Sequence, residues 1–253
     1  MKKILGFMVG CLPLVTLHAH DHVEVGKNTT NPSQLGFYGP AIQLALYVPV
    51  GEFFSGYAPH FPGGCFADEL TFTTEVNILQ DATGSDPEVE LVAVTGPAGG
   101  SLFFWETDAR LPTWARPTGW MQTSTDRPSF AVIVGGDGHV HGRAFSVDRP
   151  GEYQAVFRLR DQNNRYAMSQ NYTVLFRALT PPPLSIRVEN GQAIVGFNSR
   201  LNLVYDLEIC TDLAGGAWSP AEPHTFMDGT GQLMECVIPI EHLRAFFRLI
   251  EYK

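Results

Sequence analysis

The sequence predicts an all-β protein, in which a β-sandwich of the immunoglobulin-like or jelly-roll-like kind is followed by a smaller β domain. Its 253 residues include 25 Gly and 18 Pro, more than average usage, which favours short strands joined by turns over a helical bundle. With 44% apolar and only 17% charged residues, the chain has enough apolar side chains to form a core and does not resemble a disordered protein.

Charge and hydropathy exclude two classes of protein. The formal net charge is −9, whereas a nucleic-acid-binding protein would show a basic surface. No apolar run reaches the roughly 18 residues of a membrane-spanning helix. We therefore expect no nucleic-acid partner and no transmembrane segment.

The N-terminus has the pattern of a signal peptide over residues 1–19. Met1, Lys2 and Lys3 form a positive start, residues 4–17 are almost wholly apolar, and Ala19 offers a small residue at the cleavage position. We expect cleavage between Ala19 and His20 and an extracytoplasmic location, which is secreted, periplasmic or at the cell surface. Cys11 leaves a lipoprotein signal open as the alternative.

Residues 20–179 are expected to form the β-sandwich. In the stretch 153–160, Tyr153, Ala155, Phe157 and Leu159 alternate with mainly polar residues, which is the period of a half-buried strand. Gly- and Pro-rich turns separate this stretch from similar runs. The predicted strands are 41–48, 72–79, 89–95, 101–105, 130–134, 153–160 and 172–178.

An insertion at residues 108–128 contains Trp114 and Trp120. We interpret it as an ordered loop that covers one end of the sandwich. Exposed tryptophans in such a loop would instead provide a carbohydrate- or protein-binding surface.

Three consecutive prolines at residues 181–183 follow Thr180 and mark a stiff linker, 180–183. Residues 184–253 then form the small C-terminal β domain, with strands at 184–188, 193–197, 203–210, 233–240 and 246–250. In an oxidising compartment Cys210 and Cys236 could form a disulfide within it, and buried free thiols are the alternative. Cys65 remains without an expected partner.

The histidines are the residues that most clearly indicate a chemical function. His20 and His22 form one His-x-His pair and His139 and His141 form another. On a strand, residues i and i+2 face the same side, so each pair could offer two imidazoles to a Zn or Cu ion. His60 is a further candidate ligand. Ordinary surface or core histidines are the alternative.

Cleavage before His20 would give an N-terminal histidine, which can bind copper through its amino group and its ring. With one further histidine this resembles the histidine brace of lytic polysaccharide monooxygenases, which are secreted β-sandwich enzymes. The resemblance implies a copper-dependent enzyme acting on polysaccharide. Hydrolase, zinc-protease, phosphate-binding and dinucleotide-binding motifs are absent from the sequence, which favours a non-enzymatic protein.

Residues 139–146 (HVHGRAFS), followed by 150–153 (PGEY), are similar to bacterial surface-anchored-protein domains, including those of choice-of-anchor M proteins. The stretch 22–26 (HVEVG) looks like the His-Val-Asp-like segment near the mature N-terminus of those proteins. The resemblance covers residues 20–178 loosely and implies an extracytoplasmic β domain without established catalytic activity. Glu24 stands where Asp is usual, and Ala144 stands near the usual Trp.

The C-terminal segment from Tyr205 resembles modules common in secreted proteins of Verrucomicrobia-like bacteria. It has the order of their motif: residues 205–213 (YDLEICTDL), Trp218, a Gly-x-Gly turn at 229–231 and a final FFRL at 246–249. The resemblance implies a structural or attachment module.

Together these features predict a secreted or envelope-associated bacterial protein. We expect it to be non-enzymatic and to bind Zn or Cu through paired histidines, with a cell-envelope component or a polysaccharide as its partner. The copper enzyme and the carbohydrate- or protein-binding module are the alternatives.

Overall fold

The computed structural model describes residues 21–50, 63–74, 86–107, 109–132 and 143–253. Within these residues all regular structure is β-strand, which confirms the all-β class. None of them forms a helix long and apolar enough to cross a bilayer.

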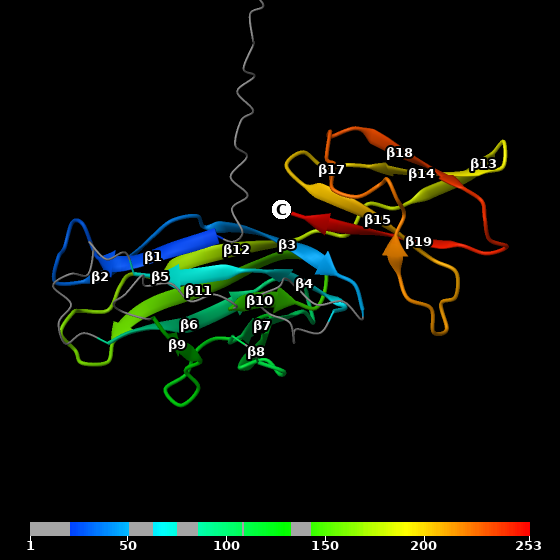
Figure 1. The fold of residues 1–253 in the computed structure, drawn as a ribbon. Helices are drawn as coiled ribbons and strands as arrows, with labels where there is room; N and C mark the ends of the chain where they lie inside the picture. The colour runs from blue at the N-terminus through cyan, green and yellow to red at the C-terminus, as the bar shows by residue number, and fades with distance from the viewer. Residues whose placement is uncertain (1–20, 51–62, 75–85, 108, 133–142) are drawn as a thin grey trace, which may run out of the picture.

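Two sheets form the first part of the chain (Figure 1). A three-stranded sheet has the order β2-β1-β5, and a nine-stranded sheet has the order β8-β7-β10-β4-β3-β12-β11-β6-β9. The strands of the small sheet are β1 (Asp21–Lys27), β2 (Leu35–Tyr38) and β5 (Leu70–Thr73). Those of the large sheet are β3 (Ile42–Val48), β4 (Cys65–Asp68), β6 (Pro87–Thr95), β7 (Ser101–Trp105), β8 (Trp114–Pro117), β9 (Ser129–Ala131), β10 (Ala144–Val147), β11 (Gly151–Asp161) and β12 (Tyr172–Ala178).

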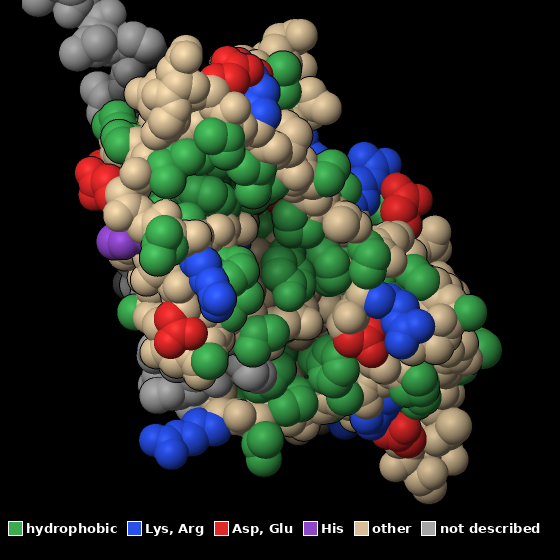
Figure 2. All heavy atoms as spheres, turned by 90° about the vertical axis from the view of Figure 1, so that its right-hand side faces the viewer, with side chains coloured by type: hydrophobic (Ala, Val, Ile, Leu, Met, Phe, Trp, Pro, Cys, Tyr) green, Lys and Arg blue, Asp and Glu red, His purple; other side chains and the backbone are tan. Residues whose placement is uncertain are grey.

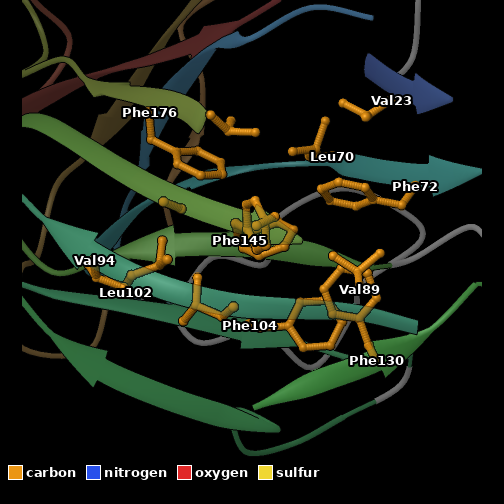
Figure 3. Close-up of a cluster of buried hydrophobic side chains, with 14 of the residues drawn as sticks. Val23, Leu70, Phe72, Val89, Val94, Leu102, Phe104, Phe130, Phe145 and Phe176 are labelled. Carbon is orange, nitrogen blue, oxygen red and sulfur yellow. The ribbon is translucent and has the colours of Figure 1, made fainter. Parts of the chain in front are cut away.

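The nine-stranded sheet curls, so that strands near its two ends meet. Phe104 on β7 and Phe130 on β9 stack with ring centroids 4.5 Å apart, although six strands separate β7 from β9 in the sheet order. Phe145 lies at the centre of the enclosed core (Figure 3). Phe72 on the small sheet closes this core against Phe145 and Phe157, with ring centroids 6.3 and 5.3 Å away, respectively. The rings of Phe145 and Phe157 are themselves 5.7 Å apart.

Most predicted strands of this part are confirmed. The segments predicted at 101–105 and 172–178 coincide with β7 and β12, and the apolar face of β11 predicted from its alternation is fully buried. The prediction at 72–79 agrees only in part, because β5 ends at Thr73 and residues 75–85 lie outside the described chain. The sequence prediction missed β1, β2, β4, β8 and β10.

Residues 185–252 form two further sheets. One has the order β13-β14-β18, and in the other β15 pairs with β16, β17 and β19. Their strands are β13 (Ser185–Glu189), β14 (Gln192–Asn198), β15 (Val204–Cys210), β16 (Ser219–Pro220), β17 (Met227–Asp228), β18 (Leu233–Pro239) and β19 (Phe246–Tyr252).

These sheets share a core that includes a strand from the first part of the chain. Val195, Phe197 and Tyr205 are buried in it, and Leu44 and Leu46 of β3 pack against them. Lys253 Nζ also lies 2.5 Å from Asp68 Oδ1; the Asp68 side chain is buried, whereas that of Lys253 is 30% exposed. The predicted domain division at 180–183 stays a prediction, but the C-terminal strands pack against β3.

The sequence left two alternatives for Cys210 and Cys236, a disulfide or buried free thiols. In the structure both are buried free thiols, and Cys65 is also a free thiol. Cys210 lies on β15 and donates to the Asp212 carbonyl at 3.2 Å. Cys236 lies on β18, in the other sheet, with its Sγ 3.7 Å from Met227 Sδ. Burial raises the pKa of the Cys236 thiol to about 11.

Candidate functional site

Most of the predicted metal ligands lie outside the described residues, namely His20, His60, His139 and His141. His22 is described: it is half-buried on β1 and lies opposite Thr71 of the parallel strand β5. Within the part of the chain that the structure describes, no three His, Cys, Asp or Glu side chains form a metal-binding group. The shared His site therefore stays a prediction.

The structure does not support the alternative in which Trp114 and Trp120 form an exposed binding surface. Trp114 starts β8, is only 7% exposed and stacks on Phe104 at 5.2 Å. Trp120 is partly buried against the same core, and its Nε1 donates to Asp126 at 3.0 Å. Both rings turn inward because the curled sheet leaves a large apolar interior at this end.

A buried ionic network next to the 108–128 insertion also has a structural role. Glu90 on β6 is 1% exposed and accepts from Arg158 at 2.7 Å and from Gln122 of the loop at 3.3 Å. Burial acts to raise the pKa of Glu90, but these hydrogen bonds and the charges of Arg158 and Arg160 hold the pKa below its ordinary value. The network attaches the loop to β6 and β11.

A pocket of about 200 Å³ lies where β2 meets the start of β12. We call it the amide pocket, because Asn28, Gln170 and Asn171 contribute carboxamides to its wall. The complete lining comes from three segments: Asn28, Thr29, Leu35, Gly36, Phe37, Tyr38, Ser169, Gln170, Asn171 and Tyr172. β2 and the β11–β12 loop lie at the end of the molecule far from the C-terminal sheets (Figure 1).

Backbone hydrogen bonds bring the distant segments together. Leu35 donates to the Ala167 carbonyl at 3.0 Å, and Ala167 donates to the Ser33 carbonyl at 2.8 Å. The side chain of Gln34 adds a bond from Nε2 to the Met168 carbonyl at 2.8 Å. The β11–β12 loop is thereby fixed against the edge of β2.

Asp161 at the end of β11 holds the other side of that loop. Its carboxylate is buried and accepts backbone N–H groups from Asp86, Asn163, Arg165 and Tyr166, at 2.7 to 3.1 Å. Burial acts to raise the pKa of Asp161, but the four N–H groups lower it by more, so the pKa lies below its ordinary value. The loop is therefore preorganised before any ligand arrives.

The apolar part of the pocket consists of stacked rings. Phe37 and Tyr172 are 4.9 Å apart with an interplanar angle of 20°, and Phe37 is supported from below by Phe72 at 6.0 Å. Tyr172 donates to the Gly39 carbonyl at 3.0 Å, and burial raises its pKa. The hydroxyl of Tyr172 is therefore neutral across the physiological range.

The polar part of the pocket has unused hydrogen-bonding capacity. Tyr38 donates to the Lys27 carbonyl and accepts from the Thr29 amide, which fixes its ring. The carboxamides of Gln170 and Asn171 make no hydrogen bond to the described residues, and each provides donors and an acceptor. None of the lining side chains is charged. Sequence reasoning missed this pocket, because the residues show no motif and meet only through the fold.

No family model and no curated protein matches this chain. The resemblances to surface-anchored-protein domains and to the C-terminal modules therefore stay predictions.

Proposed function

We propose that this chain is a secreted or envelope-associated bacterial β protein that binds a neutral saccharide unit without catalysing a reaction. The observation that supports the proposal is the lining of the amide pocket, which combines stacked rings with uncharged amides and hydroxyls. An extracytoplasmic location is consistent with the signal-peptide pattern of residues 1–19.

Sugar chemistry matches this lining in three respects. Sugar hydroxyls need both donors and acceptors, which the carboxamides of Gln170 and Asn171 supply together. The C–H face of a sugar ring packs on an aromatic ring, and Tyr172 and Phe37 provide an apolar surface. A neutral sugar needs no counter-charge, and the pocket lining has none.

The volume of the pocket limits the size of the ligand that it can hold. Pockets for drug-sized ligands span about 300–1,000 Å³, so a volume of about 200 Å³ suits one sugar unit or the end of a chain. Gly36 lines the pocket, and a Cβ there would come within 3.3 Å of the Asn28 backbone. A larger residue at position 36 would therefore disturb the wall.

Calorimetric titration with a panel of neutral mono- and disaccharides tests the proposal. Asn171→Ala and Gln170→Ala should each weaken binding about fivefold, since one hydrogen bond contributes about 1 kcal/mol. Gln162→Ala is the matched control, because Gln162 is an exposed amide of the same loop outside the pocket. The proposal fails if no neutral sugar binds at millimolar concentration, or if the pocket variants behave as the control does.

A transition-metal site remains the second proposal, supported by the spacing of the two His-x-His pairs. His22 lies on a strand, where His20 and His22 would face the same side. Zn or Cu content of the purified protein, compared with that of a His139→Ala/His141→Ala variant, tests it. Unchanged metal content in the variant would refute a shared site.

A copper-dependent enzyme acting on polysaccharide is a narrower form of this second proposal. It requires His20 to be the first residue of the mature chain. N-terminal sequencing of the secreted protein decides this requirement, and any other first residue would exclude the enzyme.

A further inference from the structure

We propose that two copies of this chain associate through the free edge of β13, in an antiparallel pairing whose two-fold axis passes at Val188. The interface lies at the end of the molecule away from the amide pocket and does not depend on the saccharide proposal.

β13 is unusual among the described strands because all five of its residues are exposed. It pairs with β14 on one side, and no other described strand pairs with it. Ile186 and Val188 are 55% and 65% exposed, although their register partners Val195 and Ala193 are buried. The apolar face of this sheet therefore extends beyond the residues that bury it. It lies at an end of the molecule where hydrophobic side chains gather in a hollow (Figure 2).

The backbone of β13 is oriented for pairing. Asn190 and Gly191 both have positive φ, 51° and 77°, and form the two-residue turn to β14. In such a hairpin the flanking residues Glu189 and Gln192 form the first hydrogen-bonded pair, and hydrogen-bonded pairs then alternate. The N–H and C=O groups of Ile186 and Val188 therefore point outward, to the free edge.

Charge selects the register. With the axis at Val188, Arg187 of each copy lies opposite Glu189 of the other, on the same face of the sheet. An axis at Arg187 would place two arginines opposite each other, which is destabilising. An axis at Ile186 would pair Arg187 with Ser185 and form no new ion pair. In the first register these cross-strand contacts join the ion pairs that Arg187 already forms with Glu189 and Glu235 of its own chain, at 2.7 and 2.5 Å, so that positive and negative side chains of the two copies alternate across the pairing.

The same register joins two outward-facing residues at the axis, so the two Val188 backbones exchange both hydrogen bonds. It also brings apolar side chains of the two copies together on one face. An exposed apolar edge strand is a template for pairing with another chain, and a second copy in this register places opposite charges, and no like charges, against the edge.

Cysteine crosslinking tests the register. In a hydrogen-bonded antiparallel pair the two Cα atoms are about 5.5 Å apart, within the reach of a disulfide. Val188→Cys should therefore give a covalent dimer under mild oxidation. Ile186→Cys is the matched control, since its two copies would lie about 13 Å apart along the strands. Equal crosslinking of both variants, crosslinking of Ile186→Cys alone, or none would each overturn the proposal.

Sedimentation equilibrium of the unmodified chain provides the second measurement. Its average mass should rise from one chain toward two as concentration increases, and Val188→Lys should hold it at one. Leu243→Lys changes a fully exposed apolar residue outside β13 and should leave the mass unchanged. A chain that stays monomeric up to millimolar concentration would contradict the pairing.

Discussion

Asp161→Asn is expected to destabilise the protein by about 3 to 6 kcal/mol. One carboxylate oxygen accepts from Asp86 and Asn163, and the other accepts from Arg165 and Tyr166. Whichever oxygen becomes the amide nitrogen, two backbone N–H groups lose their acceptor and face another donor. Each hydrogen bond to a charged acceptor contributes about 1.5 to 3 kcal/mol.

The cost should depend on pH in a defined direction. Because the pKa of Asp161 is lowered in the folded state, its stabilisation is fully present above the unfolded pKa of about 3.9 and is lost as pH falls through the folded pKa. The difference in unfolding free energy between the parent and Asp161→Asn should therefore be full at pH 7 and shrink below about pH 4.

Urea denaturation gives the unfolding free energy, and amide hydrogen exchange locates the effect in the β11–β12 loop. Asp212→Asn is the control, since Asp212 is exposed and its side chain accepts one backbone N–H, from Ala214 at 3.0 Å. A cost below about 1 kcal/mol for Asp161→Asn, or one that is the same at pH 7 and pH 3, would refute the reasoning.

Three further changes test other parts of the fold. Glu90→Gln should cost about 3 kcal/mol in urea denaturation, because it leaves Arg158 beside a neutral amide in a largely buried network. The control Glu152→Gln, in an exposed ion pair, should cost under about 0.5 kcal/mol. Equal costs for the two variants would contradict this prediction. Burial raises the pKa of the Cys65 thiol to about 12, so iodoacetamide at pH 8 should label it at least about a hundredfold more slowly in folded than in unfolded protein. Phe145→Ala should cost about 3 to 5 kcal/mol, and a loss under about 1 kcal/mol would show that the central ring of the core does not stabilise it.

Strand alternation predicted the parts of the fold that depend on local pattern. β7, β11 and β12 were found from it because their buried faces carry large apolar residues. β1 was missed, although Val23 and Val25 alternate with polar residues and are fully buried. Two apolar residues in a seven-residue strand are a weak signal beside a His-x-His pair. Asn190 and Gly191, in contrast, were a specific hairpin signal that the prediction did not use.

Long-range closure could not be predicted from the same pattern. Trp114 is buried because β7 and β9 meet across the curled sheet, through the Phe104–Phe130 stack. The amide pocket likewise depends on the contact between Gln34 and Ala167, which are far apart in the sequence. The sequence of an insertion does not show whether its tryptophan is covered by a curled sheet or exposed to solvent.

The two proposals together predict how the protein should bind a surface that displays many sugar units. β2 and β13 lie at opposite ends of the molecule (Figure 1), so a dimer joined at β13 would carry its two amide pockets at its far ends. A second pocket on the same particle binds at a high effective concentration, which can raise apparent affinity by about 10²–10⁴ without new contacts. Val188→Lys should therefore weaken retention on a sugar-coated surface while leaving calorimetric binding of the free sugar unchanged. Gln170→Ala should weaken both, since it acts within the pocket. Equal retention of Val188→Lys and the unmodified chain would show that the pockets act singly.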